Sequence, residues 1–190
     1  MRRLILQEFI SLDGMVAGPN DSVDFIPGST QGDVSFGREQ VRLMDAVDTL
    51  LLGRATYGMF AGFWPNVSEG PEQEFADKFN ALARVIFSKT LERAPWGKWK
   101  EGRIVKRDPA DEIASLQQQL GKDLLISGSI SVAQALIKAN AVDEYRLVLC
   151  PVVLAGGRPL FHGREQAPSL KLAKATALDR GAVSLVYTRR

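Results

Sequence analysis

The chain has 190 residues, and 24 Lys and Arg against 22 Asp and Glu give a formal charge of +2, too balanced to favour nucleic acid. One cysteine, Cys150, and one histidine, His162, argue against an internal disulfide and against a zinc site. No window has the 18 apolar residues that a membrane span needs, and no cleavage signal follows the first apolar run. We therefore expect one cytoplasmic domain over residues 1–190, without metal, nucleic acid or membrane as partner.

The first half of the chain alternates short apolar runs with helical spacing. A strand is predicted over residues 4–10, and Asp13-Gly14 then marks a turn. Residues 17–37 carry so many Gly, Pro, Asn and Asp that they predict a long irregular loop, of the kind that forms lids or binding loops. The further predicted elements are a helix at 38–46, a strand at 48–52, helices at 55–60 and 72–82 and a strand at 84–87.

The second half continues the alternation and then changes. Asp108 is the predicted N-cap and Pro109 the first turn of a helix that continues over 111–120 and stops at Gly121. The other predicted elements are strands at 104–105, 123–127 and 142–149, a helix at 132–138 capped by Ser129 or Ser131, and an antiparallel hairpin of 170–178 with 182–188. Alternating helices and buried strands predict an α/β fold with a largely parallel sheet.

Three predicted strands end in small or hydroxyl-bearing residues: Gly53-Arg54-Ala55-Thr56, Ser88-Lys89-Thr90 and Ser127-Gly128-Ser129-Ile130-Ser131. Ligands of open α/β sheets bind beyond the carboxyl ends of the strands, where helix N-termini favour anions. The three junctions together therefore indicate a phosphorylated ligand. The alternative is ordinary turning and capping at each junction, and neither G-x-G-x-x-G nor a P-loop motif is present.

Five segments in order resemble the dihydrofolate-reductase-like superfamily, in particular the reductase C-terminal domain of riboflavin biosynthesis as a stand-alone member. They are the runs at 9–14, 50–57, 124–129, 142–147 and 151–161. The resemblance implies a single domain with helices on both faces of a mostly parallel sheet, ending in the antiparallel hairpin. It also implies NADPH bound in extended form across the strand ends, and it suggests a homodimer through the late strands and the loop 155–159.

The resemblance assigns cofactor contacts to ten residues. Gly53, Arg54 and Thr56 resemble the turn that holds cofactor phosphates, with Arg54 at the 2′-phosphate, and Ser88 and Lys89 resemble the second half of that clamp. Gly128, Ser129 and Ile130 resemble the pyrophosphate turn, and Phe9 and Ile10 the strand whose backbone meets the nicotinamide amide. The alternatives are solvated cations at Arg54 and Lys89, and core packing for Phe9.

The substrate side departs from the dihydrofolate reductases, which carry a carboxylate on the first helix. The corresponding stretch here centres on Phe36 and has no acid, although Asp33 and Glu39 are near. Asp33 is therefore the candidate polar contact for a substrate, and Trp64 either lines that pocket or packs on its own loop. Residues 17–37 hold no Lys or Arg to anchor a substrate phosphate.

Four side chains are candidates for supplying the proton: Glu8, Asp13, Asp33 and Tyr57. Glu8 is an acid in an apolar strand, where burial would raise its pKa; the alternative is an edge or solvent-facing strand position. Tyr57 has core packing as its alternative, and His162 is expected at the surface or a dimer interface rather than in catalysis.

The resemblance thus implies a reductase that transfers hydride from NADPH to a C=N or C=O bond of a small heterocyclic substrate. It resembles 5-amino-6-(5-phosphoribosylamino)uracil reductase. Two alternatives stay open: reduction of dihydrofolate, and a regulatory protein that binds NADP(H) without turnover.

Overall fold

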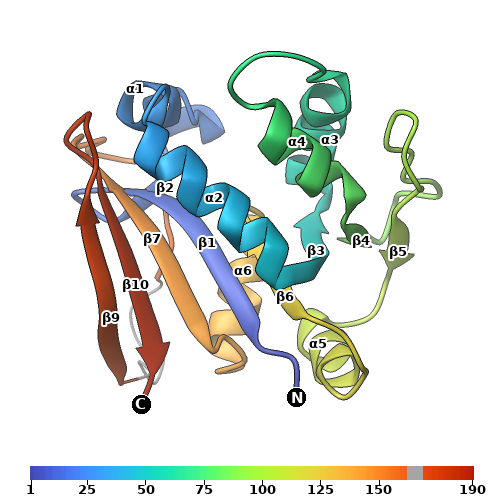
Figure 1. Cartoon of the computed structure of the whole chain (residues 1–190). Helices are drawn as coiled ribbons and strands as arrows, with labels where there is room; N and C mark the ends of the chain where they lie inside the picture. Colours follow the sequence, from blue (N-terminus) through green and yellow to red (C-terminus); the bar gives the residue numbers. More distant parts are fainter. Residues whose placement is uncertain (162–168) are drawn as a thin grey trace.

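The computed structural model describes residues 1–161 and 169–190, in which helices cover both faces of an 8-stranded main sheet (Figure 1). The strand order is β5-β4-β3-β6-β1-β7-β10-β9. The pairings from β5 to β7 are parallel, and β10 is antiparallel to both β7 and β9, which confirms the largely parallel sheet with a late hairpin. The strands are β1 (Leu4–Ser11), β3 (Val47–Gly53), β4 (Ala83–Phe87), β5 (Arg103–Val105), β6 (Asp123–Ser127), β7 (Glu144–Cys150), β9 (Leu170–Ala177) and β10 (Val183–Arg189).

Alternating side chains of β1 join two separate cores. Ile5 packs with Leu43 of α2 (Val34–Ala46) in the core that also contains α3 (Arg54–Phe63) and α4 (Gln73–Ala81). On the opposite face, Leu4 and Leu6 pack with α5 (Pro109–Gln117) and α6 (Ile130–Lys138). A strand directs successive side chains to opposite faces, and both faces of these strands are covered. The central strands therefore contain unbroken apolar runs, such as Leu4–Leu6 and Leu50–Leu52. Helices cover both faces, as predicted.

The prediction of an irregular loop over 17–37 is wrong. The 3-10 helix η1 (Pro19–Asp21) and helix α1 (Phe25–Thr30) lie within it, and α2 begins at Val34 rather than at residue 38. Pro27 is the third residue of α1, where a missing N–H costs no helical hydrogen bond. The Asp33 carboxylate caps α2 by accepting the Phe36 N–H at 2.8 Å, a cap that the density of loop-type residues concealed.

The predicted start of helix α5 is confirmed, but its predicted end is wrong. The Asp108 carboxylate accepts the Ala110 N–H at 2.8 Å, so Asp108 is the N-cap. The helix ends at Gln117, three residues before the predicted Leu120, whose side chain is fully exposed. Another helical turn would have buried no apolar surface at Leu120, so the hydrophobic effect gives no reason for the helix to continue.

A second, two-stranded sheet of β2 (Met15–Ala17) and β8 (Arg158–Pro159) escaped prediction because both strands are very short. It joins the segment after β1 to the segment after β7. Gly157 lies at this junction with φ +124°, and a Cβ there would stand 2.0 Å from the Ala17 carbonyl oxygen. Only glycine fits where the two backbones come so close.

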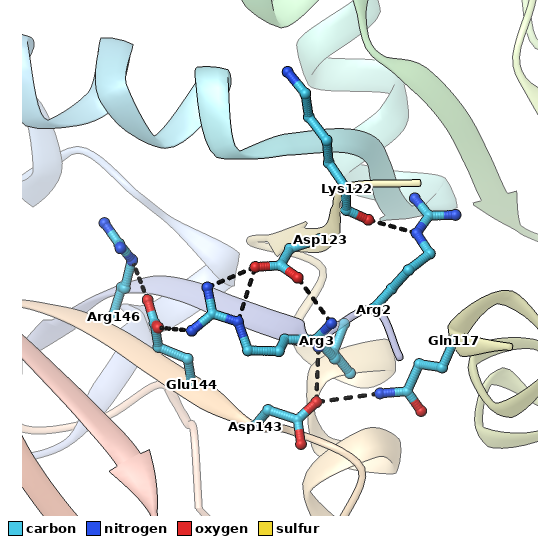
Figure 2. A network of polar contacts seen from close by, with 9 residues as sticks. Arg2, Arg3, Gln117, Lys122, Asp123, Asp143, Glu144 and Arg146 are labelled. Carbon is cyan, nitrogen blue, oxygen red and sulfur yellow. Dashed lines mark hydrogen bonds and ion pairs between the residues drawn. The ribbon is translucent and has the colours of Figure 1, made fainter. Parts of the chain in front are cut away.

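The amino ends of the central strands carry a network of ion pairs (Figure 2). The Arg3 guanidinium donates to Asp123 at 2.6 Å and to Glu144 at 3.1 Å, and Glu144 also accepts from Arg146 at 2.6 Å. Neighbouring Arg2 is buried and donates to the Lys122 carbonyl at 2.5 Å. This end of the sheet is therefore closed by paired charges. None of the helices in residues 1–161 and 169–190 has the length and apolar character to cross a membrane.

Candidate active site

A cleft of about 1730 Å³ lies at the carboxyl ends of β1, β3 and β6. The helices that follow the adjacent strands β1 and β6 cover opposite faces of the sheet, so the cleft opens at a topological switch point. Its other walls come from α1, α2, α3 and residues 66–75. Ligand sites commonly measure about 300–1,000 Å³, so this one has room for a dinucleotide and a second molecule.

Two strand–helix junctions interlock at the floor of the cleft. The Gly53 N–H donates to Ser129 Oγ at 2.9 Å, and the Ser129 N–H donates to Thr56 Oγ1 at 2.9 Å. A Cβ on Gly128 would lie 3.1 Å from Thr56 Cγ2, and one on Gly53 would lie 3.3 Å from the Val132 side chain. The glycines therefore allow the β3–α3 and β6–α6 junctions to approach, and the structure brings together the residues that were predicted for both.

The sequence predicted that Ser129 or Ser131 caps α6. Ser129 occupies the N-cap position, but its side chain makes no capping hydrogen bond. It has φ +64° beside Gly128 at φ +59°, a left-handed conformation that costs a residue with a Cβ about 1–2 kcal/mol. The bond that its hydroxyl accepts from Gly53 offsets part of this cost. Within the described residues nothing accepts from the N–H groups of Ile130 and Ser131, and a helix N-terminus of this kind attracts anions.

Four arginines line the cleft: Arg38, Arg42, Arg54 and Arg158. Arg158 donates to Ser131 Oγ at 3.0 Å, at the start of α6, and pairs with Asp21 at 3.4 Å. The other three have no ion-pair partner in residues 1–161 and 169–190. Sequence reasoning found Arg54 alone. The spacing of four between Arg38 and Arg42, which places both on one face of a helix, was the available signal for these two.

Glu8 lies in β1, an interior strand, and its side chain is 4% exposed. The alternative of an edge or solvent-facing position is therefore wrong. Glu8 alternates with Leu6 and Ile10, so it shares the face that packs against α6, and it lines the cleft. Its Oε1 has no hydrogen-bond partner among the described residues, and burial raises the pKa of this carboxyl to about 8. Glu8 is consequently protonated at neutral pH.

Aromatic side chains form the apolar walls. Phe9 packs edge-on against Phe36 of α2, with ring centroids 5.9 Å apart. Trp64 lies at 4.9 Å from both Phe63 and Phe75, and it both packs within this cluster and lines the cleft. Phe63 also lines the cleft and is 51% exposed. This side of the cleft suits a flat apolar molecule.

Asp33 lines the cleft, but its carboxylate is already bonded. One oxygen accepts from Ser35 Oγ and the Phe36 N–H, and the other accepts from the Asp179 N–H. Burial alone would raise the pKa of Asp33, but these hydrogen bonds outweigh it and lower the pKa. The geometry therefore gives Asp33 a capping function.

Two candidate catalytic residues lie outside the cleft lining. The Asp13 carboxylate accepts from the Leu154 and Ala155 N–H groups, at 3.1 and 2.8 Å, and so fastens the loop after β7. The Tyr57 hydroxyl donates to the Pro95 carbonyl at 2.9 Å, and its buried ring packs near Trp96. The structure therefore does not bring either polar group to the cleft.

Three candidate cofactor residues also lie outside the lining. Ser88 Oγ accepts from the Thr90 and Leu91 N–H groups, at 3.2 and 3.0 Å, within its own turn. Lys89 is exposed beside it, one strand away from Gly53, and Ile10 is buried in the core. Predicted His162 lies outside the described residues.

The sheet order, the hairpin and the cleft at the switch point define an α/β protein with the dihydrofolate-reductase-like fold. More particularly, the chain belongs to the family of RibD C-terminal domains, whose family model matches residues 2–184. This confirms the resemblance found in the sequence.

Individual relatives extend this comparison. The uncharacterized protein YyaP of Bacillus subtilis is 29% identical over 188 residues, covering 98% of this chain and 94% of YyaP. A candidate riboflavin biosynthesis protein from Shewanella sp. PV-4 has a similar structure, with TM-score 0.76, 26% identity and 99% coverage of both chains. Dihydrofolate reductase from Enterococcus faecalis, solved with NADP(H), has TM-score 0.63 at 14% identity, covering 99% of this chain and 96% of its own, and shows the shared fold alone.

Proposed function

We propose that the protein is an NADPH-dependent reductase that transfers hydride to a C=N or C=O bond of a small heterocyclic substrate. The observation that carries the proposal is the interlock of Gly53 and Thr56 with Ser129, which opens two helix N-termini into one cleft at the switch point. Membership of the RibD C-terminal domain family supports the riboflavin-type reductase as its nearest model. The NADP(H) complex of the enterococcal reductase supports the cofactor.

The donor set of the cleft fits a dinucleotide with an extra phosphate. The N–H groups of Ile130 and Ser131, with the Arg158 guanidinium beside them, would hold the pyrophosphate. Arg54, at the start of α3, would pair with the 2′-phosphate. Ser88 and Lys89 lie outside the cleft lining at the neighbouring strand end, and they would reach this phosphate only where it projects beyond the cleft. When bound, NADPH supplies the hydride, and the backbone near Phe9 would orient its nicotinamide.

The substrate must also gain a proton, because hydride addition to carbon leaves negative charge on the adjacent nitrogen or oxygen. Glu8 holds a proton on its carboxyl at neutral pH, in the wall of the same cleft. We assign it as the general acid. A Glu8→Gln variant that binds NADPH normally and still turns over substrate at the wild-type rate would remove Glu8 from this assignment.

The cofactor assignment is tested by thermal unfolding with NADPH and with NADH at equal concentration. A ligand at 100 times its Kd adds about 2.7 kcal/mol, which raises the midpoint of a domain of this size by about 5–10 °C. We expect this shift with NADPH, a smaller one with NADH, and loss of the difference in Arg54→Ala. Arg180→Ala, an exposed arginine outside the cleft, is the matched control. If neither nucleotide shifts the midpoint of the wild-type protein, the proposal fails.

The predicted homodimer stays part of the proposal. Strand β9 is the last strand of the sheet, most of its residues are exposed, and Leu172 is 49% exposed. Within residues 1–161 and 169–190 no strand pairs with the outer side of β9, and a strand edge of this kind can pair with another chain. Sedimentation equilibrium tests the proposed homodimer. A protein that is monomeric at micromolar concentration would contradict it.

A further inference from the structure

The segment after α3 forms a partition between the cleft and a smaller cavity. It consists of the 3-10 helix η2 (Trp64–Asn66) and the two residues after it, Val67 and Ser68, which line both the cleft and a cavity of about 130 Å³. The smaller cavity is also lined by α4 and by Lys98 and Trp99. Close packing ordinarily fixes a wall from both sides, but here the packing is interrupted on both sides. The position of this wall therefore depends on directed bonds.

Asn80 of α4 supplies such a bond. It is 2% exposed, and its Nδ2 donates to the Trp64 carbonyl oxygen at 2.9 Å. The same oxygen accepts the Val67 N–H at 3.2 Å and so closes the η2 turn. On the other side of the amide, Oδ1 accepts from Trp96 Nε1 at 2.7 Å. An indole N–H only donates and a carbonyl only accepts, so these two partners fix the orientation of the amide and require both a donor and an acceptor at this position.

A buried cation holds Asn80 from the side of the core. Arg84 is 5% exposed, and its guanidinium donates to the Asn80 carbonyl at 2.8 Å and to the Lys100 carbonyl at 2.7 Å. The same guanidinium lies 4.7 Å from the centroid of the Trp96 ring, an arrangement that favours a cation. Hydrogen bonds from a charged donor are stronger than those between neutral groups. Asn80 is thus anchored in the core and reaches from there to the wall of the cleft.

The wall at Trp64 lies away from the proposed cofactor contacts, which belong to β1, α6 and the start of α3. Helix α3 has ten residues from Arg54 to Phe63, so Trp64 lies about 15 Å along the helix from the proposed phosphate contact. The Trp64 ring packs against Phe75 and Phe79 of α4, with ring centroids 4.9 and 5.5 Å apart. These apolar contacts are not directional, whereas the bond from Asn80 fixes the backbone that carries the ring.

We propose that Asn80 is a positioning residue for the substrate side of the cleft. Through its bond to the Trp64 carbonyl it sets how far the Trp64 ring and residues 66–68 project into the cleft, and so the width that a flat ring finds there. Asn80 itself is not part of the cleft lining, so it acts through Trp64 and touches no ligand. This inference rests on the proposed function, since it concerns how the same cleft holds its substrate.

Asn80→Asp and Trp96→Phe form a matched pair of variants. The first keeps an acceptor for Trp96 but cannot donate to the Trp64 carbonyl, whereas the second removes the indole donor and leaves the bond to Trp64 in place. Isothermal titration measures the affinity for NADPH and for quinoxaline, a flat, uncharged bicycle with C=N bonds. We expect Asn80→Asp to weaken quinoxaline binding about tenfold and Trp96→Phe to weaken it less than about twofold. NADPH affinity should stay within about twofold in both variants.

A measurement on the wild-type protein decides the question even if a variant fails to fold, which the midpoint of thermal unfolding reports. The side-chain amide NMR signal of Asn80 should shift when quinoxaline saturates the cleft, and that of exposed Gln119 should not.

The outcomes separate this inference from the cofactor assignment. An unmoved Asn80 signal, equal weakening of quinoxaline by the two variants, or a wild-type protein that binds NADPH but not quinoxaline overturns the positioning role and leaves the cofactor assignment standing. Binding of quinoxaline that depends on Asn80, in a protein that does not bind NADPH, supports the positioning role and overturns the cofactor assignment.

Discussion

The two ends of the parallel sheet differ in whether their buried ionisable side chains have hydrogen-bond partners. At the amino end, Arg3 is bonded to both Asp123 and Glu144, and buried Arg2 is bonded to a carbonyl oxygen (Figure 2). At the carboxyl end, the buried Glu8 Oε1 has no partner among the described residues. Bonded charges are compatible with a stable fold, whereas a buried carboxyl without a partner costs stability and is typical of a group that binds or reacts. The contrast therefore supports placing the proposed active site at the carboxyl end of the sheet.

The largest expected effect is at Glu8. Its carboxyl has a pKa of about 8 when folded, against an ordinary 4.5, so the folded state retains a proton that the unfolded chain loses. Stability is therefore highest below about pH 4.5, as far as this group is concerned, and is lost as the pH rises to about 8. We expect Glu8→Gln to raise the free energy of unfolding at pH 8 by a few kcal/mol and to remove this pH dependence.

Urea unfolding at pH 5, 7 and 9 measures the effect, with exposed Glu92→Gln as the control. Destabilisation by Glu8→Gln at every pH would mean that the carboxylate has a partner and that the two ends do not differ.

The next effect is at the amino end. Arg2 is 7% exposed and also pairs with Asp48 and donates to Thr49 Oγ1 at 2.8 Å, so its removal breaks three bonds of a buried guanidinium and leaves the Asp48 carboxylate without its cation. We expect Arg2→Ala to lower the free energy of unfolding by about 2–3 kcal/mol, read from the urea midpoint. Arg3→Ala should cost less, about 1 kcal/mol or below, and its cost should shrink in salt, because half of its side chain is exposed. Equal costs would contradict this ranking.

The smallest expected effect on stability is at Arg54. This exposed cation has no ion-pair partner in the described chain, so Arg54→Ala should change the free energy of unfolding by no more than about 0.5 kcal/mol without ligand. The same variant should lose the preference for NADPH. A large loss of stability in the absence of nucleotide would show that Arg54 supports the fold and not the ligand.

Local signals were enough to predict most of the fold. Apolar runs identified the buried strands, and Pro109 after Asp108 identified the start of α5. Residues 17–37 were mistaken for a loop because η1 and α1 are short and lack periodic apolar residues, and α1 instead contacts β7. The start of α2 depends on the Asp33 cap, which the late hairpin also bonds.

The candidate site was predictable where it follows strand ends. Gly53, Arg54 and Gly128 belong to junctions whose position at one sheet edge follows from parallel pairing. Gln40 and Arg158 were missed because their access to the cleft depends on how α2 and β8 are placed against the sheet. The hydroxyl groups of Tyr57 and Ser88 found backbone partners that no local pattern predicts.

The glycine pair after β7 has a consequence for any library of variants. Gly157 crosses the backbone at Ala17 so closely that every other residue must push the two segments apart, whereas a Cβ at Gly156 meets nothing within 4 Å. Two adjacent, chemically identical residues thus differ sharply in tolerance. In a saturation scan, substitutions at 156 should survive and those at 157 should be depleted, since displacing this crossing moves β8 and with it Arg158 at the mouth of the cleft.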